Sequence, residues 1–402
     1  MYASGCSNLM ADLKPLRIIH CFRSPVGGIF RHVRDLAEEH AKAGHKVGIL
    51  CDSTTGGAYE DALFDSIMPH LELGLTRLPM QRSLGPSDIS TAIRTFREIK
   101  NLQPDVLHGH GAKGGAFVRL VGSQLRVSRS CVARLYSPHG GSLHYNERTL
   151  RGQAYFAIER LLERWTDNLV FVSDYERRTY TDKIGEPHAP WRLIHNGLRE
   201  HEFEPVGTAA DAADFLYIGM MRDLKGPDVF IEALRRAEQL AGRPLRGAMV
   251  GDGDDKLRYQ ARLDALGMGG RVDMHAAMPA RQAFAMARTV VIPSRAESMP
   301  YIVLEAVAAG KPVISTRVGG IPEILGPDFA GFVPPGDAEA LAGAMSQDIL
   351  QPDWLAAAMP DMDRFRSHFS ARTMAERMAS LYQDCLARKV RDTSPRTVSS
   401  LS

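Results

Sequence analysis

Residues 292–314 read IPSRAESMPYIVLEAVAAGKPVI, and this is the most informative stretch of the chain. An apolar strand is expected to end at Pro293, and the loop that follows carries Glu297. Pro300 suits the first turn of a helix, and Gly310 is expected to end that helix before the next strand. Strand, loop, helix and strand in this order indicate a parallel α/β domain.

The start of that helix is a candidate binding site for an anion. Its unpaired backbone N–H groups carry positive partial charge, and Glu305, just over one turn further on, can accept hydrogen bonds from a diol such as a ribose. Two glutamates eight positions apart are common by chance, so the spacing alone is weak evidence for a binding site. The evidence is the surrounding sequence, including the stretch VGGIPE at 318–323.

The same alternation of strands and helices extends over the rest of the chain. Strands are expected at 16–22, 46–51, 104–108, 131–136, 168–172, 191–194, 215–218, 246–250, 272–275, 289–292 and 312–316. Helices are expected from about 29, and at 88–101, 227–240, 255–266, 280–287, 301–309 and 370–389, with a glycine-bearing loop at 110–115. Since parallel strands need crossovers long enough to hold a helix, the pattern predicts two doubly wound α/β domains.

Composition limits the classes of function. The 402 residues carry a net charge of +2, which does not indicate a nucleic-acid partner. The five cysteines form no C-x-x-C pair, which favours a reducing compartment, and a cytoplasmic location is expected. No apolar window is long enough for a membrane span, and the start of the chain does not resemble a signal peptide.

Two further patterns admit alternatives. Gly251-Asp-Gly253 resembles a dinucleotide fingerprint but lacks its third glycine, which disfavours a dehydrogenase. His108-Gly-His110 and the segment from His139 to His144 bring histidines together, yet no carboxylate stands beside them as a further ligand. We therefore predict no metal site.

At this point the sequence resembles glycosyltransferase family 4, whose hallmark is a Glu, seven residues and a second Glu in this setting. The resemblance covers about residues 16–385 and implies the α/β GT-B fold, with two Rossmann-like domains facing across a cleft. The predicted parts are an acceptor-side domain (1–205), a nucleotide-sugar-binding domain (206–370), a helix that crosses back (371–390) and a disordered tail (391–402). Family members of this class retain anomeric configuration and need no metal; the nucleotide-sugar is a co-substrate, so no cofactor is expected.

The resemblance also implies roles for individual residues. Glu297 is assigned to the donor sugar, Glu305 to the ribose, and His139 to the sugar near the reacting carbon. Arg222 and Lys225 are assigned to the donor diphosphate, where fixed cations would neutralise the leaving group. The candidate catalytic residues are thus Glu297, His139, Arg222 and Lys225. The candidate donor-binding residues are Gly27, Gly28, Gly219, Gly251, Gly253, Met299, Pro300, Tyr301 and Glu305, and base contacts are expected from the segment 275–278.

The acceptor is expected to be a saccharide or a polyprenyl-linked saccharide of cell-surface polysaccharide synthesis. Five arginines are candidates for contact with an anionic membrane surface or a polyprenyl diphosphate, although solvated faces are the commoner explanation: Arg126, Arg129, Arg134, Arg148 and Arg151. Two alternatives are a sugar-nucleotide-modifying enzyme of the epimerase or dehydrogenase kind, and a silent sugar-nucleotide-binding module. The presence of Glu297, Arg222 and Lys225 disfavours the silent module.

Overall fold

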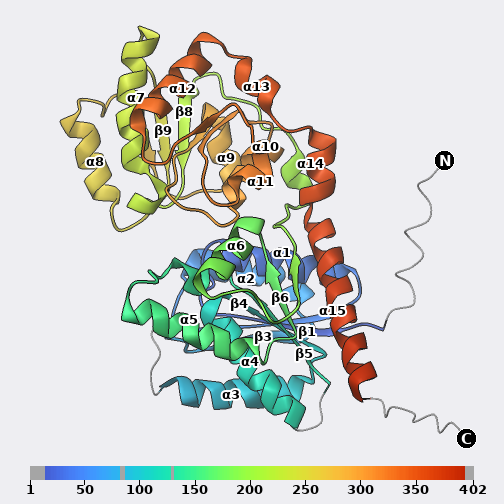
Figure 1. Ribbon diagram of the computed structural model, residues 1–402. Coiled ribbons are helices and arrows are strands. Elements are labelled where there is room, and N and C mark those ends of the chain that lie inside the picture. Colours follow the sequence, from blue (N-terminus) through green and yellow to red (C-terminus); the bar gives the residue numbers. More distant parts are fainter. Residues whose placement is uncertain (1–13, 82–86, 128–130, 394–402) are drawn as a thin grey trace, which may run out of the picture. The chain divides into compact units, whose positions relative to one another are not determined.

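The computed structural model describes residues 14–81, 87–127 and 131–393. The chain forms two compact units, each built around its own sheet (Figure 1). The first unit contains residues up to 171, 179–194 and the segment from 375, and the second contains 172–178 and 195–374. Our prediction of domain boundaries after residues 205 and 370 stays a prediction.

The first unit holds a parallel sheet of seven strands in the order β3-β2-β1-β4-β5-β6-β7. The strands are β1 (Arg17–Phe22), β2 (Lys46–Asp52), β3 (Gly74–Leu78), β4 (Val106–His110), β5 (Ala133–Ser137), β6 (Asn168–Phe171) and β7 (Trp191–Leu193). Its helices are α1 (Gly28–Lys42), α2 (Ala58–Ile67), α3 (Ser87–Leu102), α4 (Gly111–Val127) and α5 (Leu150–Glu163), while α6 (Asp174–Lys183) belongs partly to each unit.

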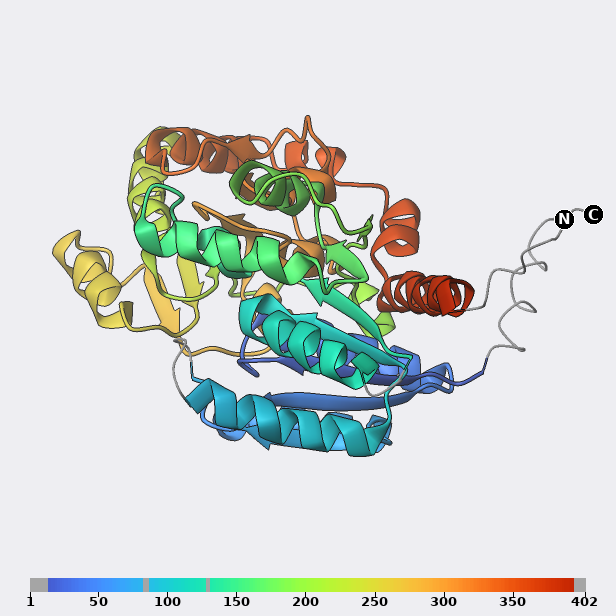
Figure 2. The ribbon, with the colours of Figure 1, turned by 60° about the horizontal axis from the view of Figure 1, so that its bottom comes forward.

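Helices cover both faces of this sheet. Apolar side chains of α1 and α2 pack with Phe22 and Ile49 on one face, whereas those of α4 pack with Ile19 and Leu107 on the other. Helices α3, α4 and α5 lie side by side on that second face (Figure 2). Alternate residues of each strand therefore enter two separate cores.

The second unit holds a parallel sheet of six strands in the order β10-β9-β8-β11-β12-β13. The strands are β8 (Ala213–Ile218), β9 (Gly247–Val250), β10 (Val272–His275), β11 (Ala287–Ile292), β12 (Val313–Thr316) and β13 (Phe332–Val333). Its helices are α7 (Pro227–Ala241), α8 (Lys256–Ala265), α9 (Ala280–Ala285), α10 (Tyr301–Ala308), α11 (Ile321–Leu325), α12 (Ala338–Leu350), α13 (Trp354–Ala358) and α14 (Met362–Phe369). This strand order is that of a Rossmann domain.

The last helix, α15 (Ala371–Thr393), joins the first unit from Ala375 onward. Tyr382 of α15 is fully buried there, and its hydroxyl lies 2.8 Å from Nδ1 of His108. The helix runs three residues past its predicted end at 390, and residues 394–402 of the predicted tail lie outside the described residues.

The predicted loop at 110–115 is wrong, because α4 begins at Gly111. The glycines there serve close packing of a helix against strands. A Cβ on Gly114 would lie 2.2 Å from the carbonyl oxygen of Cys21, and one on Gly115 would lie 2.3 Å from the ring of Tyr136. Only a residue without a side chain lets α4 approach β1 and β5 this closely.

Of the five arginines proposed for membrane contact, the prediction for Arg134 is wrong. Its side chain is buried and its Nε lies 3.3 Å from Oδ2 of Asp167, so its charge is neutralised inside the unit. Arg148 and Arg151 are exposed, and the side chains of Arg126 and Arg129 lie outside the described ones. No helix within the described ranges is long and apolar enough to cross a bilayer.

Candidate active site

The strand order of the second sheet reverses between β8 and β11, which pair in parallel. The loops at 219–226 and 293–300 leave the carboxyl ends of these two strands. Ligands of doubly wound sheets bind at such a switch point. Six of the thirteen predicted site residues lie in these two loops: Gly219, Arg222, Lys225, Glu297, Met299 and Pro300.

Lys225 and Glu297 meet at this point. Nζ of Lys225 lies 2.6 Å from Oε1 of Glu297, and the Ser294 hydroxyl donates to the same oxygen at 2.7 Å. The Glu297 side chain is only 8% exposed, whereas that of Lys225 is 29% exposed. Within the part of the chain that the structure describes, Oε2 of Glu297 has no hydrogen-bond partner. That oxygen can accept a hydrogen bond from a ligand.

The structure does not bring Arg222 into this pair. Its side chain is exposed, and its Nη1 contacts Sδ of Met220 at 3.4 Å. No carboxylate partner of Arg222 is found among the described residues, so the guanidinium is available to an anion in the solvent.

Arg295 connects the loop after β11 to the loop after β8 and to the start of α7, a contact that was not predicted from the sequence. Its guanidinium donates two hydrogen bonds to Asp228, at 2.9 and 2.6 Å, and its backbone N–H donates to the carbonyl of Leu224 at 2.8 Å. The Asp228 carboxylate raises the pKa of Arg295. Such a two-pronged contact fixes geometry as well as charge. The sequence signal was limited to Arg295 lying in the stretch 292–314 and Asp228 lying at the start of the helix expected at 227–240.

Glycines let the backbones of neighbouring loops touch. Gly251 has φ +150°, and a Cβ there would lie 1.9 Å from the carbonyl oxygen of Gly219. Gly319 has φ +60°, and a Cβ there would lie 1.7 Å from the carbonyl oxygen of Glu297. These φ angles and contacts both require glycine. The position of Glu297 therefore depends on Gly319 behind it.

The helix after Glu297 is α10, which begins at Tyr301 as predicted, although Pro300 was expected inside its first turn. Pro300 is the cap residue that precedes Tyr301, the first residue of the helix, and Met299 before it is buried. Glu305 is half-buried one turn further on. Gly310, with φ +69°, follows the last turn, and its N–H donates to Val307, which completes a glycine-terminated helix end.

A pocket of about 240 Å³ lies at the carboxyl ends of β8 and β9. It is lined by Ile218, Gly219, Met220, Val250, Gly251, Asp252, Ala277 and Met278. Asp252 accepts hydrogen bonds from the N–H of Ala277 and from Lys256, both at 2.7 Å, and these lower its pKa. The pocket thus includes part of the segment expected to contact the base. Gly253, which was also predicted to bind the donor, packs against the backbone of Met221.

In the first unit, Gly27 and Gly28 form the start of α1. Gly27 has φ +79° and caps the helix, while Gly28 is its first residue. A Cβ on Gly27 would meet no atom within 4 Å. The positive φ therefore explains Gly27, and the space beside it is open for a ligand to approach the backbone.

His139 ends a chain of imidazoles. Nε2 of His139 lies 3.0 Å from Nδ1 of His110, and Nε2 of His110 lies 3.0 Å from Nδ1 of His20. Burial and neighbouring histidines hold the pKa of all three well below the usual range, so the rings are neutral at pH 7. His139 has φ +49°, an uncommon backbone conformation for a residue with a side chain.

Two sets of histidines bring their ring nitrogens within 4.8 Å of one another, and each set could hold a metal ion: His20 with His108 and His110, and His32 with His110 and His139. The described residues include no carboxylate in either set. Hydrogen bonds already engage both ring nitrogens of His108, with Tyr382 and Ser137. Our prediction of no metal site stays a prediction.

Comparison with known proteins identifies the family. Residues 26–201 match the family described as Glycosyltransferase Family 4, and residues 199–359 match the family described as Glycosyl transferases group 1. The chain belongs to glycosyltransferase family 4. This glycosyltransferase is 27% identical over 369 residues to D-inositol 3-phosphate glycosyltransferase of Thermobispora bispora, a match that covers 85% of this chain and 81% of that protein.

Solved structures confirm the GT-B fold. Sucrose-phosphate synthase from Thermosynechococcus elongatus superposes with a TM-score of 0.73 at 22% identity, over 93% of this chain and all of that one. HepE of Anabaena in complex with UDP-glucose gives a TM-score of 0.72 at 17% identity, over 92% of this chain and all of that one. The family and the fold class predicted from the sequence are thus confirmed. The roles of individual residues stay predictions.

Proposed function

We propose that this glycosyltransferase moves a sugar from a nucleotide-sugar donor to a saccharide or lipid-linked saccharide acceptor, with retention of anomeric configuration and without a metal. The proposed setting is cell-surface polysaccharide synthesis in the cytoplasm, at the inner face of the plasma membrane for a lipid-linked acceptor. The observation that carries the proposal is the contact between Lys225 and Glu297, 2.6 Å long, at the switch point of the second sheet.

The cations of the β8 loop suit the departing nucleoside diphosphate. Lys225 uses one of its three N–H groups on Glu297, which leaves two for phosphate oxygens. Arg222 is exposed nearby in the same loop and adds a second positive charge. Two fixed cations can stabilise the charge that develops as the sugar leaves, which is the role a metal would otherwise have.

Glu297 is suited to hold the donor sugar. Lys225 and Ser294 fix its Oε1, and Oε2 can accept a hydrogen bond from a sugar hydroxyl. Glu305 is assigned to the ribose and the pocket beside Gly219 to the base. For His139 we keep the role of holding sugar hydroxyls through a neutral imidazole, which the lowered pKa favours.

The donor class can be tested first by thermal shift. The UDP-glucose complex of HepE makes uridine diphosphate the first ligand to try, followed by GDP and ADP. A ligand that binds only the folded protein raises its melting temperature. The donor sugars of the best nucleotide are then offered with saccharide acceptors, and the anomeric configuration of the product is determined by NMR. An inverted product would contradict the retaining mechanism.

The site is tested by Lys225→Ala and Glu297→Gln. Each is expected to lower kcat about 10²- to 10³-fold, the usual effect of removing one group that stabilises developing charge. The matched control is Lys46→Ala, which removes a Lys–Glu contact from the surface of the first unit and should leave kcat unchanged. Undiminished turnover by either site variant would overturn the assignment.

A further inference from the structure

Helix α5 of the first unit presents a row of apolar side chains to the solvent. Leu150 is 86% exposed and Leu161 is 49% exposed. At 100° per residue these two side chains share one face of the helix with three others. We call this face the α5 stripe; it consists of Leu150, Ala154, Ala157, Ile158 and Leu161, all of them exposed, and the exposed Trp165 follows two residues after the end of the helix.

The opposite face of α5 already fills the core of the unit, so the stripe is not needed for folding. Phe156 and Leu162 are buried there. Glu159 is buried too and pairs with Arg119 at 2.8 Å, while Glu163 accepts hydrogen bonds from Tyr180 and from the N–H of Ala189. Both acidic groups of the helix are thus satisfied inside the unit and place no negative charge on the stripe.

Arginines border the stripe on both sides. Arg151 lies along one edge and Arg160 and Arg164 along the other, while Arg148 precedes the helix. Within the described stretch 144–166, Glu147 is the one exposed acidic residue. Glu186, whose carbonyl accepts a hydrogen bond from Arg160, is a second exposed acidic residue beside the carboxyl end of α5. Four arginines against these two glutamates leave the margins of the stripe net basic.

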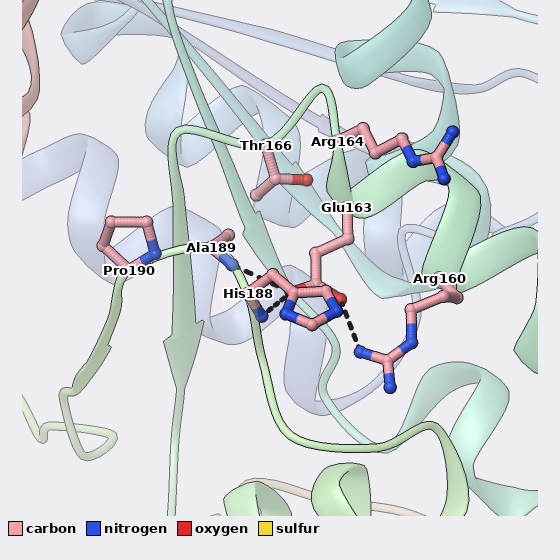
Figure 3. A pocket seen from close by; sticks show the side chains of 7 residues that line it. All are labelled: Arg160, Glu163, Arg164, Thr166, His188, Ala189 and Pro190. Atoms are coloured by element: carbon pink, nitrogen blue, oxygen red, sulfur yellow. Dashed lines mark hydrogen bonds and ion pairs between the residues drawn. The ribbon is translucent and has the colours of Figure 1, made fainter.

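Figure 3 shows how the two arginines at the carboxyl end of α5 differ. They line a pocket of about 460 Å³ together with Glu163, Thr166, His188, Ala189 and Pro190. Arg160 turns toward Glu163, at 3.5 Å, and donates to the carbonyl of Glu186, so its charge is partly balanced. Arg164 points away from Glu163, and no carboxylate partner for it is found in the described ranges. Arg164 is the arginine left for an anion.

We propose that the α5 stripe and its arginines bind the surface of a bilayer that contains anionic phospholipids. An exposed apolar row on a helix can enter the boundary of the acyl chains, while arginines beside it meet lipid phosphates. Trp165 just beyond the stripe suits the headgroup level, where aromatic rings gather. Charge favours a bilayer over a second copy of the chain as the partner of the stripe. A second copy that packs through the same surface would bring its own arginines against the arginines of the first.

The inference rests on the part of the proposed function that places the enzyme at a membrane, and it deepens that part, while lipid binding through the first unit does not depend on which donor the second unit takes. It names the surface that would bring the enzyme to a lipid-linked acceptor. Alanine at Arg164 should weaken binding about fivefold, the contribution of one basic residue near an anionic surface.

The test is co-sedimentation of the full chain with two kinds of vesicle: phosphatidylcholine alone, and an equimolar mixture with phosphatidylglycerol. We expect binding to the mixed vesicles that weakens at high salt, and a loss of at least about tenfold in the double variant Leu150→Glu, Leu161→Glu. The matched control is Leu257→Glu in α8 of the second unit, where the leucine is 84% exposed and no such stripe surrounds it. This control should bind like the wild type.

Three results would overturn the proposal. They are equal vesicle binding by the double variant and the wild type, equal binding to neutral and mixed vesicles, and a dimer in analytical ultracentrifugation that the double variant dissolves. The melting temperature of each variant and its shift with UDP are measured in parallel. A folded variant with an unchanged UDP shift excludes unfolding as the cause, whereas a wild type that UDP does not stabilise would count against a uridine donor and leave the vesicle result intact.

Discussion

Replacing Gly319 by alanine should impair the enzyme by displacing Glu297. A Cβ at residue 319 would lie 1.7 Å from the carbonyl oxygen of Glu297, whereas real Cβ atoms essentially never come within 3.0 Å of another heavy atom. The two backbones must therefore separate by more than about 1 Å, and a shift of that size in a catalytic group costs about 10²-fold in rate. The positive φ of +60° adds about 1 to 2 kcal/mol of strain, which lowers stability.

Gly336→Ala separates these two effects. Gly336 has φ +78°, and a Cβ there would meet nothing within 4 Å, so this variant carries the strain without the collision. Turnover with the donor found by thermal shift and the free energy of unfolding in urea are measured for both variants. We expect similar losses of stability but a loss of kcat only in Gly319→Ala. Equal turnover in the two variants would refute the idea that the Gly319 contact positions Glu297.

Three other predictions concern pH, metal and the imidazole chain. Glu323 is partly buried, which favours its neutral form, but hydrogen bonds from His195 and from the N–H groups of Asp174 and Tyr175 outweigh this and lower its pKa. A lowered folded pKa contributes stability above the unfolded value of about 4.3 that is lost as pH falls through the folded value. In urea unfolding, Glu323→Gln should therefore be less stable than the wild type at neutral pH, and the difference should shrink as pH falls below about 4.3. Dialysis against EDTA should leave turnover unchanged, and a loss restored by one divalent metal would contradict the metal-free mechanism. His110→Asn should lower kcat about tenfold or more, because His139 loses its partner, and should leave the UDP shift unchanged; an equal fall in UDP affinity would point to unfolding instead.

The regular elements followed from the sequence because their signals are local. Apolar runs such as 287–292 form strands that helices cover on both faces, so hydrophobicity alone marks them. Gly310 lies at a helix end that it terminates through its own positive φ. Lys225 and Glu297 were singled out through the family resemblance, and the pairing of β8 with β11 brings the loops that carry them together.

What the sequence did not show depends on tertiary partners. Gly114 and Gly115 follow a strand as turn glycines would, and only the positions of Cys21 and Tyr136 show that they belong to a helix pressed against the sheet. Arg134 looks like a surface charge until Asp167 is placed beside it. Arg295 likewise gains its role from Asp228, a partner 67 positions away in the sequence.

The most direct measurement of the central claim is calorimetric titration of UDP and of uridine into the wild type and Lys225→Ala. If Lys225 holds the donor diphosphate, the variant should bind UDP at least about tenfold more weakly, because one charge-assisted hydrogen bond is lost, while both proteins bind uridine equally. Equal affinity of the two proteins for UDP would contradict the assignment of Lys225, and with it the donor site proposed at the ends of β8 and β11.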